Sequence, residues 1–278
     1  MPCLAGPVPR REVKANIQMQ YKTTVAAAIA ATLSSSALAG VIYATDFSEF
    51  SLGDINGQNG WSTYDPSFPS GGGNFTNVVS GGAAGNGVQM FSGTSGTSSP
   101  RYAWAPGYGS QWQAETLAGN TTLSVSVDMK LSSGSASTAR IGVITFDSTG
   151  AKILGGFYVQ QSTGAVLMLG YYNNAGTLNN FAFATGVSVA LDTWTTFVTE
   201  WDSVTGRFTL SWGDNSFYVD GAGAGSIAEE TDLYATRNGS TVSANAYFDN
   251  LSISAVPAPG ALALLGAAGL AGARRRRA

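Results

Sequence analysis

The segment TTLSVSVDMKL, residues 121–131, decides the fold class of this chain. Its apolar residues recur at every second position and alternate with serine, aspartate and lysine. This period of two is typical of an antiparallel strand that has one face in a core and the other in water. The apolar face holds Leu123, Val125, Val127, Met129 and Leu131.

Seven further runs of β-branched and aromatic residues share this texture and are separated by Gly, Ser, Asn and Asp. No run has the period of an amphipathic helix, so we expect no amphipathic helix in this domain. Eight to twelve strands at this spacing predict an all-β, antiparallel β-sandwich that forms one domain over residues 40–255. The seven runs are residues 140–147, 152–161, 165–172, 193–202, 206–213, 215–221 and 246–254.

The composition excludes several classes of function. The chain has no histidine, and its one cysteine is Cys3, so a Ser-His-Asp triad, a Cys-His pair and a disulfide are excluded. Residues 40–255 contain six Lys and Arg against sixteen Asp and Glu, a charge of about −10. Because nucleic-acid binding requires clustered cations, we do not expect a nucleic-acid partner.

The N-terminal region has the pattern of a secretory signal peptide. The apolar run VAAAIAATL, residues 25–33, is too short to span a bilayer and is followed by small residues. Ala37, Ala39 and Gly40 form the predicted signal-peptidase site, with the cut after Ala39, so that residues 1–39 are leader and signal peptide. The alternative is an alanine-rich helix of the fold. Met19 opens a compact signal by itself, and translation is expected to start there.

The C-terminal region, residues 256–278, has three parts. A proline motif cannot continue a strand, residues 261–273 are small and apolar, and an arginine cluster follows. Thirteen residues of helix reach only about 20 Å, which is short of a bilayer core. The motif is Val256, Pro257, Ala258, Pro259 and Gly260, and the cluster is Arg274, Arg275, Arg276 and Arg277.

This three-part order resembles the C-terminal sorting signals of the PEP-CTERM type of exported bacterial proteins, in a VPAPG variant that lacks the usual glutamate. The resemblance implies transient insertion of a short hydrophobic helix in the inner membrane. It also implies processing by an exosortase-like enzyme, and a final location at the cell surface or in the extracellular matrix. The alternative is a plain membrane anchor.

Two segments of the body resemble concanavalin A-like (laminin-G-like) jelly rolls. Residues 192–221 contain a Trp-Asp pair, a Thr-Gly turn at 202–206 that joins two adjacent strands in that family, and a later Asp-Gly. Residues 246–254 resemble the closing strand, which is expected to pair near the opening strand at residues 41–50.

Carbohydrate binding is one prediction from the aromatic residues, because aromatic rings stack on sugar faces. The glycine-rich segment 53–119 is expected to form either a binding rim or plain surface loops, and its aromatics either contact sugar or pack beneath the loops. Trp194, Trp201 and Trp212 lie in patterned strands and are expected in the core. The candidates for carbohydrate binding are Trp61, Tyr64, Trp104, Tyr108, Trp112, Tyr171 and Tyr172.

A structural Ca²⁺ is the second prediction, with Asp46, Glu49 and Asp249 as ligands near the paired terminal strands. The alternative is that Asp46 and Asp249 cap turns or accept hydrogen bonds from backbone N–H groups.

Glycoside hydrolysis is the third prediction, because Glu200 and Asp202 lie two apart on one strand. The third acidic position of the jelly-roll glucanase motif is Thr205, so we expect Asp202 to open a turn and Glu200 to face solvent.

The sequence therefore predicts an exported, non-catalytic bacterial surface or matrix protein that is adhesive or binds extracellular polysaccharide. The alternative is a secreted polysaccharide-degrading enzyme with a jelly-roll fold.

Overall fold

The computed structural model describes residues 39–65, 75–93, 100–133, 137–174, 177–220, 223–240 and 242–257. For residues 171–174 and 177–182 it describes the backbone and not the side chains. Residues 39–256 form one compact unit. Ala37 of the predicted cleavage site, and the sorting signal from Ala258 to Arg277, lie outside the described residues. Within the described ranges, no helix has the length and apolar character needed to cross a membrane.

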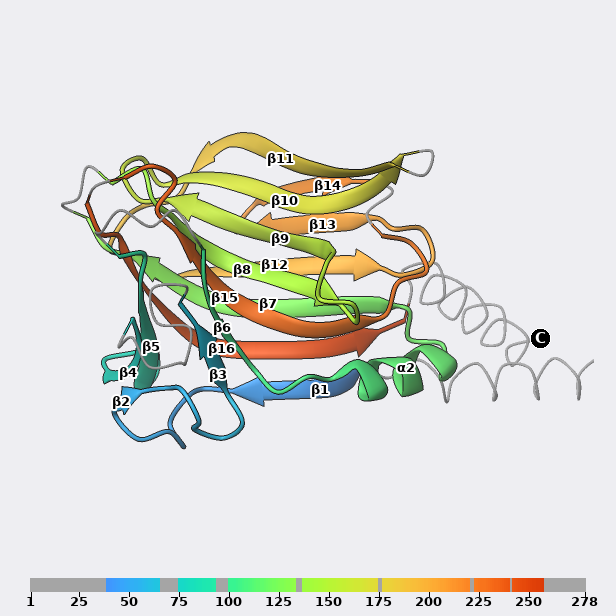
Figure 1. Cartoon of the computed structure of the whole chain (residues 1–278), viewed down its shortest axis with the longest axis horizontal. Helices are drawn as coiled ribbons and strands as arrows, with labels where there is room; N and C mark the ends of the chain where they lie inside the picture. The colour runs from blue at the N-terminus through green and yellow to red at the C-terminus, as the bar shows by residue number, and fades with distance from the viewer. Residues whose placement is uncertain are drawn as a thin grey trace, which may run out of the picture. The chain divides into compact units, whose positions relative to one another are not determined.

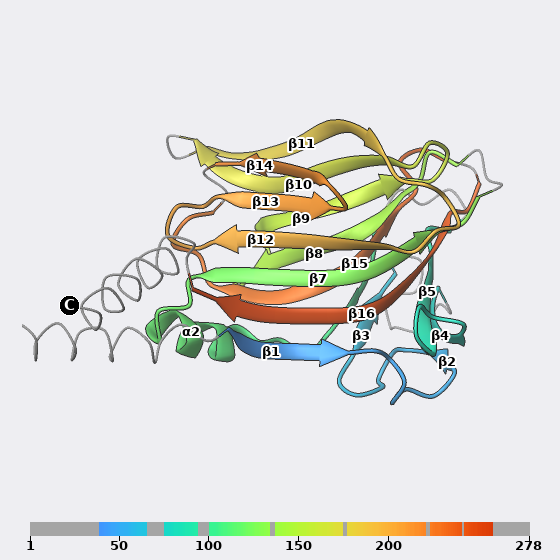
Figure 2. The same ribbon diagram turned by 180° about the vertical axis from the view of Figure 1, so that it is seen from behind.

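Two antiparallel sheets pack face to face in this unit (Figures 1 and 2). The first, the nine-stranded sheet, has β7 beside β16 at its centre, and β1 pairs with β16 outside the main path. In spatial order its strands are β14 (Asn215–Val219), β13 (Phe208–Trp212), β12 (Thr195–Asp202), β7 (Thr122–Leu131), β16 (Asn245–Val256), β5 (Asn86–Phe91), β4 (Thr76–Ser80) and β2 (Gly53–Asp54), with β1 (Gly40–Thr45) beside β16.

The second sheet, the seven-stranded sheet, brings together strands from both halves of the chain. Its late strand β15 lies between β8 and the early strand β6. In spatial order its strands are β11 (Thr177–Ser188), β10 (Ala165–Asn174), β9 (Ile153–Gln160), β8 (Arg140–Asp147), β15 (Ala228–Thr236), β6 (Arg101–Trp104) and β3 (Ser62–Tyr64).

The core fills the space between the sheets. All five predicted apolar residues of β7 are buried, which confirms the period-two prediction. Across the gap, Phe157 of the seven-stranded sheet stacks on Phe197 of the nine-stranded sheet, with ring centroids 4.2 Å apart. The buried apolar residues of the two inner faces therefore form one continuous core.

Two pairings confirm the expected connectivity. The opening strand β1 pairs with the closing strand β16, with Ala44 opposite Ser252. The turn at 202–206 joins the neighbouring strands β12 and β13. Gly206 has a φ of 70°, a conformation that favours glycine, and its N–H donates to the carbonyl of Asp202 over 2.7 Å.

The sequence prediction of strands and helices was wrong in two respects. The structure contains sixteen strands within the described residues rather than eight to twelve, because short strands such as β2 and β3 carry too few residues to show a period. It also contains a helix, α2 (Gly109–Leu117), that was not expected. Only Gly109 and Trp112 of α2 are buried, so a single anchoring side chain replaces the apolar stripe of a longer amphipathic helix.

The Phe157–Phe197 stack gives a test of how the sheets are held together. Phe197→Ala is expected to lower the free energy of unfolding by about 3–5 kcal/mol, because it opens a cavity between the two sheets. Chemical denaturation of the purified protein measures this. Glu200→Ala, an exposed change on the same strand, is the control and should change stability by less than about 0.5 kcal/mol. Equal effects of the two variants would contradict the assigned core.

Candidate functional site

The outer face of the seven-stranded sheet, which points away from the core, carries aromatic and acidic side chains. Alternate residues of β15 face opposite sides, so Leu233 enters the core while Asp232 and Tyr234 point outward. On the neighbouring strands, Asp232 lies opposite Trp104 of β6 and Ile144 of β8. The register therefore brings residues from four separate segments of the chain onto one surface.

Aromatic rings form a continuous group at the β3–β6–β15 side of this face. Tyr102 lies at its centre, and its ring centroid is 5.5 Å from Tyr234, 6.1 Å from Phe146 and 6.4 Å from Tyr64. Tyr102, Phe146 and Tyr234 are half-buried, and Tyr64 is 41% exposed. These partly exposed rings thus lie beside a cluster of buried apolar residues that includes Ile144.

An open pocket of about 410 Å³ lies among these rings. Its wall combines the aromatic side chains with two carboxylic acids from one strand. Such a mixture of apolar surface and a few polar groups is typical of a small-molecule binding site. The lining residues are Tyr64, Tyr102, Trp104, Phe146, Gly150, Ala151, Ile153, Glu230 and Asp232.

The two acids of the pocket are poorly solvated. Asp232 is only 2% exposed, and its Oδ1 atom is buried without a hydrogen-bond partner within the part of the chain that the structure describes. Burial, and secondarily the negative charge of Glu230, raise the pKa of Asp232 well above its ordinary value. Burial and the charge of Glu229 also raise the pKa of Glu230. An unpaired buried carboxyl in a pocket is a common sign of a functional site.

A hydrogen-bonded chain beneath the sheet holds β15 in place. The hydroxyl groups of Tyr108 and Thr231 lie 2.8 Å apart, and those of Thr231 and Thr145 lie 3.1 Å apart. Thr231 stands between Glu230 and Asp232 in sequence and points to the core side. Since all three hydroxyl groups are buried, this chain fixes the position of the strand that carries both acids.

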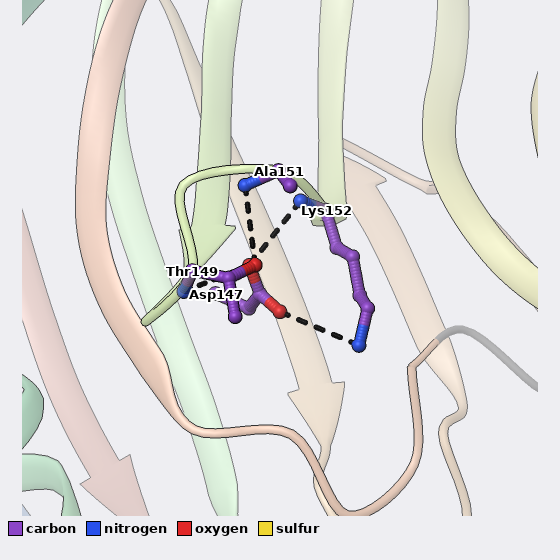
Figure 3. A network of polar contacts seen from close by, with 4 residues as sticks. All are labelled: Asp147, Thr149, Ala151 and Lys152. Carbon is purple, nitrogen blue, oxygen red and sulfur yellow. Dashed lines mark hydrogen bonds and ion pairs between the residues drawn. The ribbon is translucent and has the colours of Figure 1, made fainter.

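The turn between β8 and β9 forms one rim of the pocket through Gly150 and Ala151. Figure 3 shows how this turn is held by Asp147, whose Oδ1 accepts from the hydroxyl of Thr149 over 2.6 Å and from the N–H of Lys152 over 3.2 Å. The Nζ of Lys152 lies 3.7 Å from Oδ2 of the same carboxylate. Asp147 is buried, and its carboxylate is the partner of the Lys152 ammonium group.

The structure brings Tyr64 and Trp104, two of the predicted carbohydrate-binding residues, into the pocket. Three others are buried: Trp61, Tyr108 and Trp112 are each 1% exposed. Their assignment to sugar binding is wrong, because a ring inside the core has no face on which a sugar can stack. Their packing beneath the loops is the alternative that the sequence left open. The side chains of the remaining candidates, Tyr171 and Tyr172, lie outside the described residues.

The tryptophans expected in the core divide similarly. Trp201 and Trp212 are buried, as predicted. Trp194 is half-exposed, and the Nζ of Lys130 lies 4.9 Å from its ring centroid and 4.7 Å from that of Tyr247. On the outer face of the nine-stranded sheet, these two aromatic rings therefore contact the ammonium group of Lys130.

The three predicted calcium ligands do not form one cluster. Asp46 and Glu49 are exposed and line an open hollow at the end of β1, where the pKa of Asp46 is lowered by hydrogen bonds from the side chain and the N–H of Ser48. Asp249 is buried, and its oxygens accept from the N–H groups of Ala84 and Asn250. No group of three acidic or sulfur ligands that could hold a metal occurs in the described ranges. The carboxylate of Asp249 thus accepts hydrogen bonds from backbone N–H groups, as the alternative expects, and the structural Ca²⁺ stays a prediction.

Glu200 and Asp202 follow the structural alternative. Oδ1 of Asp202 accepts from the N–H groups of Val204 and Thr205, so Asp202 opens the turn as expected. Glu200 is exposed on the outer face of the nine-stranded sheet. The two residues lie on the opposite sheet from the pocket.

Sequence reasoning missed Glu230, Asp232, Tyr102 and Phe146 as site residues. It did not identify β15 as a strand, because three acids in the run AEETDLYAT obscure its pattern. The signal was present, since Thr231, Leu233 and Ala235 alternate with more polar residues. Their position beside β6 could come only from the sheet order.

No family model matches this chain, and no curated protein matches it in sequence. The fold resembles many solved structures. Among them are the cellulose-induced protein Cip1 (TM-score 0.52, 12% identity, 78% of this chain and 98% of that one) and the endo-β-1,4-glucuronan lyase of the fungus Trichoderma reesei (0.51, 9%, 78% and 96%). A sialidase also matches (0.50, 11%), although this chain spans only 19% of its length. At these identities the likeness defines the fold, an antiparallel jelly-roll-like sandwich.

The buried acid predicts a specific dependence of stability on pH. Because the pKa of Asp232 is raised by folding, the wild type loses stability as the pH rises from the ordinary carboxyl pKa through the raised value. The loss is about 1.4 kcal/mol for each unit by which folding raises the pKa. Asp232→Asn has no carboxyl group to ionise, so its melting temperature should gain on that of the wild type between pH 4 and pH 8.

Calorimetry across this pH range makes the comparison. Asp214→Asn, at an exposed turn between β13 and β14, removes the same charge and serves as the control. A difference between Asp232→Asn and wild type that stays constant from pH 4 to pH 8 would show that Asp232 ionises normally in the folded protein.

Proposed function

We propose that this chain is an exported bacterial protein whose concanavalin A-like sandwich domain binds extracellular polysaccharide without cleaving it. The observation that carries the proposal is the pocket on the seven-stranded sheet, where aromatic rings surround two carboxyl groups. The solved structures with a similar fold include proteins named for cellulose, glucuronan and sialic acid, which agrees with a carbohydrate ligand.

The pocket has the two kinds of group that a sugar requires. The C–H faces of a pyranose are apolar and gain by covering aromatic carbon, which Tyr64, Tyr102 and Trp104 present together. The hydroxyl groups need acceptors, and the oxygens of Glu230 and Asp232 supply them. Since Oδ1 of Asp232 lacks a partner in the described part of the chain, a ligand hydroxyl or ammonium group would remove the cost of its burial.

The two carboxyls also raise the alternative of hydrolysis. A glycosidase places one carboxyl on each side of the scissile bond. Glu230 and Asp232 lie two residues apart on one strand, about 7 Å along the same wall, which is the spacing of the first two acids of the jelly-roll glucanase motif. The third acidic position of that motif is Ala235 here, so the strand lacks the third acid and this arrangement supports binding rather than cleavage.

We also propose that the ends of the chain direct its location. Signal peptidase would remove residues 1–39 by cutting after Ala39, in the site formed by Ala37, Ala39 and Gly40. Residues 256–278 would then hold the protein in the inner membrane until an exosortase-like enzyme acts near the proline motif. The mature protein would reside at the cell surface or in the extracellular matrix.

Substitutions in the pocket test the binding site. Tyr64→Ala and Tyr102→Ala should each weaken binding to the best glycan of an array by about tenfold, since each removes a ring from the stacking surface. Tyr218→Ala is the matched control, because Tyr218 is 62% exposed on β14 of the other sheet. Equal effects of Tyr102→Ala and Tyr218→Ala would place the ligand elsewhere, and release of new reducing ends would contradict the non-catalytic proposal.

Processing of the C-terminus tests the location. Replacement of the four arginines 274–277 by serine should leave the tail uncleaved or misplaced, because the arginines hold it on the cytoplasmic side. Intact-mass measurement of the protein from surface fractions should find the wild type shortened near Pro257. A wild type that keeps residues 258–278 would support the plain anchor instead.

A further inference from the structure

The charge of the pocket restricts which sugar it can accept. Among the described residues its lining contains two acids and no lysine or arginine. An acidic sugar such as a uronate would bring another carboxylate to a wall that already holds two carboxyl groups and offers no cation from those residues. A sugar that carries a positive charge would instead compensate both carboxyls.

Three cations near the pocket, in sequence or on its sheet, are held by other groups. Arg101, which precedes Tyr102 on β6, lies 2.8 Å from the buried carboxylate of Asp65. Lys152 at the rim lies beside the buried carboxylate of Asp147 (Figure 3). Arg140, on the same outer face, stacks over Tyr158 at 4.8 Å and donates to its hydroxyl group over 2.9 Å. Because Arg140 pairs with Thr236, it lies four residues along β15 from Asp232, roughly 13 Å away.

Asp232 is the second and independent indication of a ligand. The strands beside it contribute Trp104 and Ile144 at its level, and neither side chain carries a charge. Its buried Oδ1 has no hydrogen-bond partner among the described residues, and the residue lines the pocket. A buried carboxyl with no bound cation is costly, and an ammonium group placed in the pocket would supply both the charge and the missing donor.

The aromatic lining favours the same kind of ligand. An ammonium group is attracted to the faces of Tyr, Trp and Phe rings, and the attraction grows when water is excluded. The pocket presents Tyr102, Trp104 and Phe146 beside the acids. The rings can therefore cover the apolar face of a sugar and at the same time stabilise a cationic substituent.

We propose that the pocket recognises a polysaccharide with free amino groups, that is, 2-amino-2-deoxyhexose units without their N-acetyl groups. Asp232 and Glu230 pair with the ammonium group, and Tyr64, Tyr102 and Trp104 cover the sugar ring. This inference rests on the proposed carbohydrate-binding function and narrows it to one chemical class. No bond is made or broken in this recognition.

Titration calorimetry of the purified protein with four hexasaccharides tests the assignment. The β-1,4-linked hexamers of glucosamine, N-acetylglucosamine and glucose, together with an oligogalacturonate, separate cationic, neutral and anionic ligands. The glucosamine hexamer should bind at least tenfold more tightly than the N-acetylated and glucose hexamers, and the oligogalacturonate most weakly.

Matched variants separate the pocket from the general negative charge of the domain. Asp232→Asn and Glu230→Gln should each weaken binding of the glucosamine hexamer by about tenfold and change binding of the neutral hexamers by less than twofold. Asp214→Asn removes the same charge outside the pocket and should have less than a twofold effect on every ligand. Circular dichroism and melting curves verify that each variant is folded.

The outcomes distinguish this inference from the function on which it rests. If the glucose or N-acetylated hexamer binds as tightly as the glucosamine hexamer, carbohydrate binding stands and the preference for an ammonium group is wrong. If Asp214→Asn weakens binding as much as Asp232→Asn does, the attraction is non-specific. If no hexamer binds and the glycan array is also silent, both the inference and the proposed function fail.

Discussion

The packing of the two sheets through alternate side chains is the constraint on which the rest of this structure depends. The stack of Phe157 on Phe197 joins β9 of one sheet to β12 of the other, and every strand near it must direct one set of residues inward. In a strand the other set then points outward. Burial of Leu233 and Thr231 in β15 thereby forces Asp232 and Glu230 to the outer face.

The outward-facing residues of the two sheets differ in character. On the nine-stranded sheet, β7 presents Ser124, Ser126 and Asp128, a polar surface that suits solvent. On the seven-stranded sheet, the outward residues include a second, smaller apolar cluster around Ile144 and Tyr158. Because solvated surfaces rarely carry such a group of rings beside a buried acid, the second face is the one suited to a ligand.

Burial of the two carboxyl groups lowers the stability of the folded protein, and hydrogen bonds on the core side of the same strand hold it in place. The buried hydroxyl groups of Tyr108, Thr231 and Thr145 hold β15 from the core side. Tyr108, which immediately precedes α2, was a candidate for sugar binding. It instead supports the strand of the two acids from the core side.

The carbohydrate-binding candidates show how far local patterns reach. Of the aromatic residues predicted from the glycine-rich segments, Tyr64 and Trp104 line the pocket. Trp61 and Trp112 come from the same kind of segment and are buried. The flanking sequence is alike in both cases. What separates them is the side that each ring faces, because Tyr64 of β3 and Trp104 of β6 line the outer pocket, whereas Trp112 of α2 packs against Trp201 in the core.

Period, composition and turn residues in the sequence are enough to predict the all-β class, the buried face of β7 and the turn at 202–206, because these are local features. The pairing of the first and last strands was implied by the resemblance to concanavalin A-like jelly rolls, and the structure confirms it. The position of β15, and the rings beside its acids, came from the folded structure alone. Residues 64, 104, 146 and 232 are distant in the chain and meet through the sheet order. That order is set by the packing of all strands together, and no local pattern encodes it.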